Sequence, residues 1–307
     1  MSALAATTAE LSRWQFSITI IYHFLFVPIT IGMGLFVASL QTAWYVTGQE
    51  RYQRLTVFFG KILLVNLALG IVTGIVQEFQ FGMNWASYSR YVGDVFGAPL
   101  AIEGLVAFFL ESVFIGLWIF GAGRLSPRVH LATIWAVAIG STMSAYVILA
   151  ANSWMQHPVG YRVNAATGRA EMTSLWAIMT QGNLLEAFAH VMLAAIVTAA
   201  ALVLAVSAYH LLKKNEMELF GHAAQISLVV LLIGGIAVST VGHFQGQLVA
   251  REQPMKMAAA EALFKTEKPA SLSLFALQPF EKYPSKNNVN IAVPHALSFL
   301  TDWHWNS

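Results

Sequence analysis

The sequence contains no cysteine, which removes a whole group of possible cofactor sites. Disulfides, thiolate-bound metals, cysteine-ligated iron–sulfur clusters and haem attached covalently through Cys-x-x-Cys-His are all excluded for this chain. A haem bound by these residues would therefore have to be held by histidine, methionine or a carboxylate.

Charged residues are also scarce. They make up 10% of the 307 residues, whereas soluble domains usually carry about 25%. Hydrophobic residues make up 57%, and the mean hydropathy is +0.62, which indicates lipid as the solvent. The net charge of +2 is too small to indicate a nucleic-acid partner, so none is expected. No basic region precedes the first apolar segment, so we expect it to be retained as a membrane anchor.

Six apolar segments reach the roughly 20 residues that a membrane-spanning helix needs. They lie at 15–43, 59–82, 97–122, 129–152, 185–212 and 222–246. Pro99 and Pro127 are expected at the starts of the third and fourth helices, where a missing N–H does no harm. The sequence thus predicts an all-α integral membrane protein, with a bundle of six transmembrane helices over residues 1–246.

Residues 247–307 are more polar and rich in proline, and we expect an extramembrane loop with one short helix near 255–266. The short loops after the first, third and fifth helices hold seven Lys and Arg residues, against four on the other side. Because positive charges favour the cytoplasmic side, the N-terminus and residues 247–307 are predicted to lie outside a cell membrane.

Ionisable side chains inside a membrane span are functional candidates by default. His23 and His190 lie in different helices, an arrangement that suits axial ligation of haem iron, although a lone membrane histidine is as often a hydrogen-bond donor between helices. Glu103 and Glu111 are two turns apart and within about 80° around one helix. Such a pair suggests a proton relay or a metal or haem contact; the alternative is a pair of buried structural acids.

Three further features of the sequence are weaker signals, and for the charged residues among them a functional and a structural interpretation both stay open. Lys256 and Glu261 could bind the two ends of a quinol head group, or they could simply be solvated, and on a regular helix they would point about 140° apart. Glu78 lies near a helix end and has a structural alternative of equal weight. Gly70 and Gly74 have the small-xxx-small spacing of helix packing.

Five segments carry a resemblance to a known family. They are ELSRWQFSITIIYHFLFVPITIG (10–32), FFGKILLVNLALGIVTGIVQEFQFGMNW (58–85), YVGDVFGAPLAIEGLVAFFLES (91–112), ANSWMQHPVG (151–160) and QPMKMAAAEALF (253–264). In order and spacing they resemble the N-terminal part of cytochrome bd-type quinol oxidase subunit I, in particular its actinobacterial branch. The resemblance covers essentially the whole chain.

The resemblance implies a terminal quinol oxidase that passes electrons from membrane quinol through haems to dioxygen, forming water with separation of charge. It implies that His23 ligates one of two closely spaced haems, either haem d or the high-spin haem b, and that His190 ligates the low-spin haem b. It places Glu103 and Glu111 beside the oxygen site.

The resemblance also assigns roles to four further residues. Ser144 and Asn152 match polar residues near the proton path, and Lys256 and Glu261 match the quinol-binding pair of the loop over 247–307. Subunit II of the oxidase is the implied partner.

Members of this family continue beyond the loop into three more helices that carry further haem ligands. The resemblance therefore implies that residues 1–307 alone are inactive and need a chain supplying the missing C-terminal helices. Two alternatives to an oxidase are a proton-coupled membrane transporter and a truncated, non-catalytic remnant. The broken helices or inverted repeats typical of a transporter are not found in the sequence.

Overall fold

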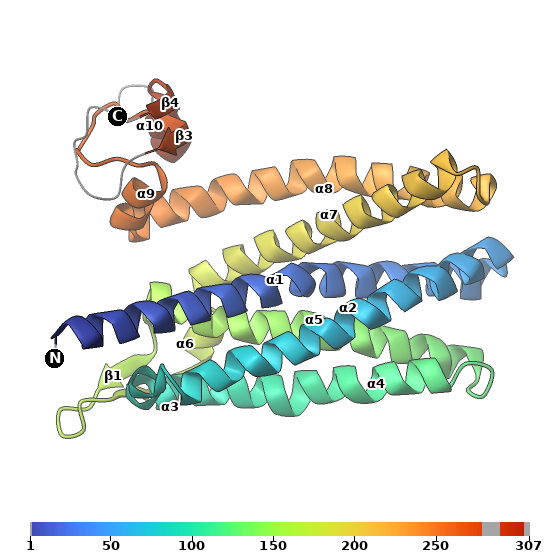
Figure 1. Cartoon of the computed structure of the whole chain (residues 1–307), viewed down its shortest axis with the longest axis horizontal. Coiled ribbons are helices and arrows are strands. Elements are labelled where there is room, and N and C mark those ends of the chain that lie inside the picture. Colours follow the sequence, from blue (N-terminus) through green and yellow to red (C-terminus); the bar gives the residue numbers. More distant parts are fainter. Residues whose placement is uncertain (1, 278–288, 304–307) are drawn as a thin grey trace. The chain divides into compact units, whose positions relative to one another are not determined.

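The computed structural model describes residues 2–277 and 289–303, with side chains from residue 7 onward (Figure 1). Six segments of the described chain are helical and long and apolar enough to cross a membrane. They are Thr7–Thr47, Glu50–Gly82, Ala86–Phe120, Pro127–Gln156, Leu175–Leu212 and Met217–Glu252. The predicted all-α membrane protein with six transmembrane helices is therefore confirmed.

The chain divides into two compact units, Met1–Val238 and Ser239–Ser307. In the first unit, α1 packs against α2, α5 and α7, and α4 packs against α5. The elements of this unit are α1 (Ser2–Thr47), α2 (Glu50–Gly82), α3 (Ala86–Ile102), the π-helical turn η1 (Glu103–Ala107), α4 (Phe108–Phe120), α5 (Pro127–Gln156), β1 (Tyr161–Val163), β2 (Ala170–Met172), α6 (Leu175–Met179), α7 (Gly182–Leu212) and most of α8 (Met217–Glu252).

Two apolar clusters hold the first unit together. The larger one joins buried side chains of α1, α2, α5 and α7, among them Met33, Phe59, Ile134 and Val203. The second is built on α3, α5 and the segment before α7, and includes Val95 and other buried side chains: Val92, Phe96, Ala150, Ala151, Trp154, Ala170, Ile178 and Leu184. Because lipid tails are as apolar as these side chains, close packing rather than burial from water must hold the helices together.

A close contact between α1 and α7 depends on a glycine. A Cβ atom at Gly32 would lie 2.2 Å from the carbonyl oxygen of Ala195 and 2.6 Å from the Cβ atom of Ala199. The alanines are one turn apart on α7, so the three residues form a small-residue contact of the kind common between membrane helices. Any side chain at residue 32 must push the two helices apart.

We therefore expect Gly32→Ala to destabilise the bundle by about 1–3 kcal/mol through overpacking. Gly34→Ala is a matched control two residues away, since a Cβ atom there would lie 3.6 Å from the Cα atom of Ala138, an ordinary contact. The thermal unfolding midpoint in detergent should fall for the first variant and stay or rise slightly for the second. Equal midpoints for the two variants would show that the α1–α7 contact does not depend on Gly32.

Pro99 was expected at the start of the third span, but the structure places it elsewhere. It lies inside α3, which begins thirteen residues earlier at Ala86. The early start has a packing reason, because Tyr88, Val92 and Phe96 form an apolar stripe at helical spacing that joins the second cluster. Four residues after Pro99 the helix changes to the π-helical turn η1, where the N–H of Phe108 donates to the carbonyl of Glu103.

A short antiparallel hairpin, which the sequence analysis did not predict, connects α5 to the segment before α7. Strands β1 and β2 pair from Tyr161 with Met172 to Val163 with Ala170, and the N–H of Met172 donates to Asp94 on α3 at 2.7 Å. Across the hairpin, Glu171 accepts hydrogen bonds from Asn164 and from Arg162. The bonds from Asn164 and Arg162 favour the ionised carboxylate and lower the pKa of Glu171.

The sign of the resulting pH dependence follows from the lowered pKa. The stabilisation of the hairpin is present above the ordinary glutamate pKa near 4.5 and is lost as the pH falls through the lower folded-state pKa. We expect faster amide hydrogen exchange over 161–172 at pH 3 than at pH 6, after correction for intrinsic rates. Glu171→Gln should remove this difference; a difference that persists in the variant would assign it to another group.

The second unit contains the end of α8, α9 (Pro254–Ala260), the antiparallel strands β3 (Leu272–Leu277) and β4 (Val289–Val293), and α10 (Ala296–Asp302). Gln247 donates to the carbonyl of Leu300 at 3.0 Å, which ties α8 to α10. The predicted boundary at 246/247 falls inside α8, because the helix continues through this polar stretch to Glu252. The expected helix near 255–266 is shorter, since it ends at Ala260.

Candidate functional site

His23 on α1 is seated against α2. Its Nδ1 atom lies 3.0 Å from the hydroxyl oxygen of Thr73. A Cβ atom at Gly74 would lie 3.0 Å from the Cε1 atom of the imidazole, so the ring occupies the space that a side chain there would fill. The Gly70–Gly74 spacing, expected to serve helix packing, thus also makes room for a histidine ring. With Nδ1 engaged, Nε2 is the nitrogen left for a metal.

Glu103 is the centre of a polar cluster contributed by four helical elements. Its Oε1 atom accepts a hydrogen bond of 2.7 Å from the hydroxyl of Ser144 on α5. The carboxyl groups of Glu103 and Glu78 lie close together, and His23 lies within electrostatic range of Glu103. Three of the predicted site residues, His23, Glu103 and Ser144, are therefore brought together.

The π-helical turn brings Glu111 toward the same side of the helix as Glu103. The turn accommodates one extra residue, so Glu103 and Glu111, eight residues apart, are related as residues seven apart in a regular α-helix. Their directions around the helix axis then differ by about 20° instead of 80°. Glu111 is only 9% exposed and packs against Gly140 on α5, where a Cβ atom would lie 3.1 Å from its Cγ atom. Both carboxylates therefore face α5, where their contact residues Ser144 and Gly140 are one turn apart.

His190 lies on α7, and its Nδ1 atom is buried with no hydrogen-bond partner among the residues that the structure describes. An imidazole nitrogen in that state is costly unless something else binds the ring. Ala195, five residues after His190 on α7, is occupied by the contact with Gly32.

Asn152 stands apart from the cluster. It is exposed near the end of α5, and its Oδ1 atom accepts a hydrogen bond of 2.6 Å from Gln156 one turn later. The contacts described for Asn152 do not connect it to Glu103 or Ser144, eight residues away on the same helix.

Lys256 and Glu261 belong to the second unit. Lys256 is exposed on α9, and Glu261 caps the end of that helix. The Oε2 atom of Glu261 accepts a hydrogen bond of 2.8 Å from the N–H of Ser273, and its carbonyl accepts one of 2.7 Å from the hydroxyl of Ser273. The helix ends at Ala260, directly before Glu261, and the N–H of Glu261 still donates to the carbonyl of Met257 at 3.0 Å. The separation of about 140° expected on a regular helix therefore still applies to the two residues.

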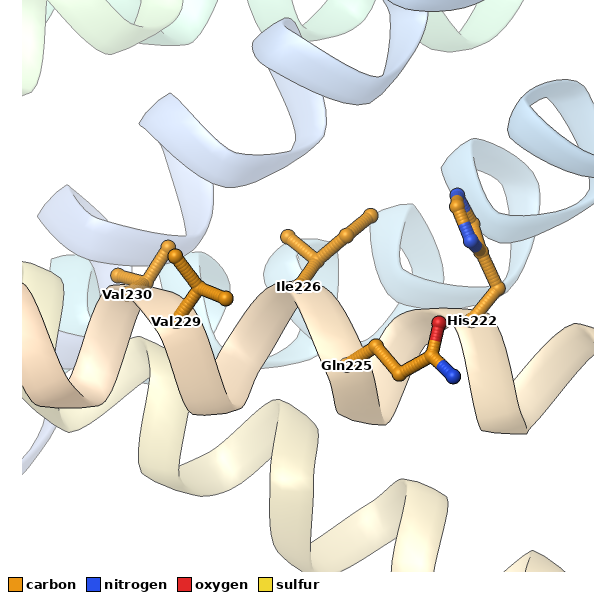
Figure 2. A pocket seen from close by; sticks show the side chains of 5 residues that line it. All are labelled: His222, Gln225, Ile226, Val229 and Val230. Carbon is orange, nitrogen blue, oxygen red and sulfur yellow. The ribbon is translucent and has the colours of Figure 1, made fainter.

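A separate groove lies along one face of α8 in the first unit (Figure 2). It is lined by residues at helical spacing: His222, Gln225, Ile226, Val229 and Val230. The Nε2 atom of His222 lies 3.3 Å from the hydroxyl of Tyr52 on α2. The groove contains none of the predicted site residues, so it is distinct from the cluster around Glu103.

Thr73 and Glu78 are the two cluster members that the sequence analysis did not select. Glu78 was considered, but its place near a helix end left a structural alternative of equal weight. Thr73 carries no charge, and its only signal is its place next to Gly74 in a glycine-spaced stretch. Only the packing of α1 on α2 shows that its hydroxyl meets His23.

The described residues contain no group of three or more His, Asp or Glu side chains placed to hold a bare metal ion. Haem differs, since its macrocycle supplies four ligands and the protein adds only one or two. The Nε2 atom of His23 suits such an axial bond, and His190 is a second histidine whose ring has an unengaged nitrogen among the described residues.

These features define a class: a membrane-embedded helical bundle with histidines suited to haem iron and carboxylates suited to proton transfer. Comparisons with known proteins place the chain within it. Residues 11–307 match the family model described as cytochrome bd terminal oxidase subunit I. The chain therefore belongs to this family, a family of haem proteins.

Individual relatives agree with this placement. The chain is 47% identical over 291 residues to cytochrome bd ubiquinol oxidase subunit 1 of Bacillus subtilis, covering 94% of this chain and 61% of that protein. It is 42% identical to cytochrome bd-II ubiquinol oxidase subunit 1 of Escherichia coli, covering 95% and 56%. The solved structure of the bd oxidase from Geobacillus thermodenitrificans has a TM-score of 0.86 and 28% identity, covering 98% and 68%. The chain thus spans about three fifths of the length of these curated relatives.

Proposed function

We propose that the chain is part of subunit I of a terminal quinol oxidase, which oxidises membrane quinol and reduces dioxygen to water. The observation that carries this proposal is the cluster in which Ser144 donates to Glu103 and His23, with Nε2 available, lies within electrostatic range of Glu103. The family match supports it, and favours an oxidase over a proton-coupled transporter.

Two histidines would hold the haems. His23 would ligate haem d or the high-spin haem b, and His190 would ligate the low-spin haem b. When bound, these groups supply one-electron redox chemistry and an iron that binds dioxygen. The chain's own contribution is to fix the two imidazoles on different helices and to surround the first with groups that hold protons.

Glu103, Glu111 and Ser144 would deliver protons. The hydroxyl of Ser144 donates to Oε1 of Glu103, so this carboxyl group can receive a proton through a partner that both donates and accepts. Glu111 lies farther along the same face of the helix, at the position of a preceding relay group. Asn152 is proposed as an outlying polar residue of the path.

The loop over 247–307 would bind quinol. Lys256 would donate to one oxygen of the head group, and Oε1 of Glu261 would accept a hydroxyl proton from the other, while Oε2 stays bonded to Ser273. We propose that the N-terminus and this loop lie outside the cell membrane. Quinol protons would then leave outside, and the protons for water would arrive from inside.

Subunit II is the proposed partner, because the relatives that match this chain are named as numbered subunits of an oxidase. We further propose that activity needs the part of subunit I that the matched region of the relatives does not include. Where it is not continuous with residues 1–307, a second chain would supply its C-terminal helices.

The experiment is quinol-dependent oxygen uptake by the assembled oxidase in a strain that lacks its own quinol oxidases. Quinol must drive uptake that stops when the quinol is left out. Haem-containing membranes without any such uptake would reject the oxidase and leave the alternative of a non-catalytic remnant.

The quinol site has its own test. Lys256→Ala should raise the apparent KM for quinol roughly tenfold, the loss of one charge-assisted hydrogen bond, while the haem content is unchanged. Lys265→Ala, an exposed lysine of the same unit, is the control and should leave KM as it is. The same KM in both variants and the wild type would remove Lys256 from the quinol site.

A further inference from the structure

Thr73 has a hydrogen-bonding pattern that determines what it can offer to His23. A threonine hydroxyl has one hydrogen and two lone pairs. The hydroxyl of Thr73 donates along its own helix, with the carbonyl oxygens of Leu69 and Gly70 each 2.9 Å away. Its single hydrogen is therefore directed to the helix backbone, and the lone pairs remain for the imidazole.

The ring nitrogen that faces Thr73 must then carry a hydrogen. Nδ1 of His23 lies 3.0 Å from the hydroxyl oxygen, which acts here as an acceptor. The carbonyl of Gly70, which can only accept, also lies close to the imidazole. A neutral imidazole with hydrogen on Nδ1 has its free lone pair on Nε2.

The position of Thr73 is itself fixed. Its side chain is buried, and the ring of His23 occupies the space that a Cβ atom at the adjacent Gly74 would fill, with Cε1 3.0 Å and Nε2 3.5 Å from that position. Residues 73 and 74 thus form a seat with two functions: Gly74 admits the ring, and Thr73 selects its tautomer.

We propose that Thr73 is a positioning residue for the haem that His23 holds: its hydroxyl fixes the Nδ1–H tautomer and leaves Nε2 as the ligand. This rests on the proposed function. Hydrogen bonds to the second nitrogen of a ligating histidine orient the ring and raise its basicity, and losing one lowers affinity about 10- to 100-fold. Thr73 would therefore strengthen the bond between His23 and iron without touching substrate.

The test compares Thr73→Val with Thr73→Ser in the haem-loaded oxidase isolated from membranes. Valine keeps the shape and removes the acceptor, whereas serine keeps the hydroxyl. Two readings are independent of turnover: the rate of haem loss from the His23 site to apomyoglobin, and the iron–histidine stretching frequency of the reduced protein. The valine variant should lose haem about tenfold faster and show a lower frequency. The serine variant should match the wild type in both.

The absorption band of the haem at His190 reports whether the valine variant is folded. If that band were lost as well, Thr73→Ala would provide the same comparison without a branched apolar side chain. A folded valine or alanine variant with the wild-type frequency and rate of haem loss would overturn the assignment of Thr73. A wild-type protein without haem would instead overturn the proposed function, so the two failures are distinguishable.

Discussion

Replacing His190 by alanine is expected to abolish the absorption band of the low-spin haem while leaving the haem held by His23 in place. The reason is that the two imidazoles lie on different helices, α7 and α1, and His23 has its own support from Thr73 on α2. The buried Nδ1 atom of His190 has no partner among the described residues, so its removal breaks no hydrogen bond of the fold. Reduced-minus-oxidised spectra of membranes measure the result.

His210→Ala is a matched control for this experiment, because His210 is on the same helix α7. Its ring stacks on Phe220 at a centroid distance of 3.9 Å, and its Nδ1 atom is 2.9 Å from Asn215. Both partners are protein groups, so this variant should retain both haems even if it is less stable. An unchanged low-spin band in His190→Ala would show that another residue is the ligand.

Glu103→Gln should slow oxygen reduction by roughly 100-fold, the usual contribution of a proton-transfer group. Glutamine keeps the size of the side chain and can still accept from Ser144 through its amide oxygen, but it cannot exchange a proton in this way. Quinol binding should be unaffected if the quinol site lies in the second unit. Steady-state oxygen uptake should therefore show a lower kcat with an unchanged apparent KM for quinol.

Two further variants calibrate the effect of Glu103→Gln. Ser144→Ala removes only the hydrogen-bond partner of Glu103 and should reduce the rate less than loss of the carboxyl group does. Glu218→Gln, at an exposed position at the start of α8, should have no effect. A wild-type rate in Glu103→Gln would remove this residue from the proton path, whatever its contact with Ser144.

The six spans could be predicted from the sequence because the bilayer imposes a length and composition that few other structures share. The ends of the helices could not, because helices extend past the lipid wherever neighbouring elements continue to pack. The segment 86–96 is an example. Its charged and polar residues make its overall composition unlike a membrane span, and only the structure shows that its apolar stripe packs into the second cluster. The β1–β2 hairpin was missed because its strands are three residues long.

Part of the candidate site followed from the sequence as well. Buried histidines and glutamates are rare enough in a membrane span to stand out singly, and His23, Glu103 and Ser144 do lie together. The π-helical turn was not predictable from spacing, although it sets the direction of Glu111 relative to Glu103. Thr73 could not be selected from the sequence for another reason. Its proposed role depends on the direction of its hydroxyl hydrogen, which is set by the backbone carbonyls of the preceding turn of α2.

The roles assigned to these residues stay predictions, and the haems are the claim on which the others depend. The most direct measurement is the visible spectrum of the purified oxidase, first oxidised and then reduced with quinol under anaerobic conditions. We expect quinol alone to produce the bands of a low-spin haem b together with those of at least one high-spin haem. A protein that shows no haem bands, or bands that quinol does not reduce, would contradict this expectation.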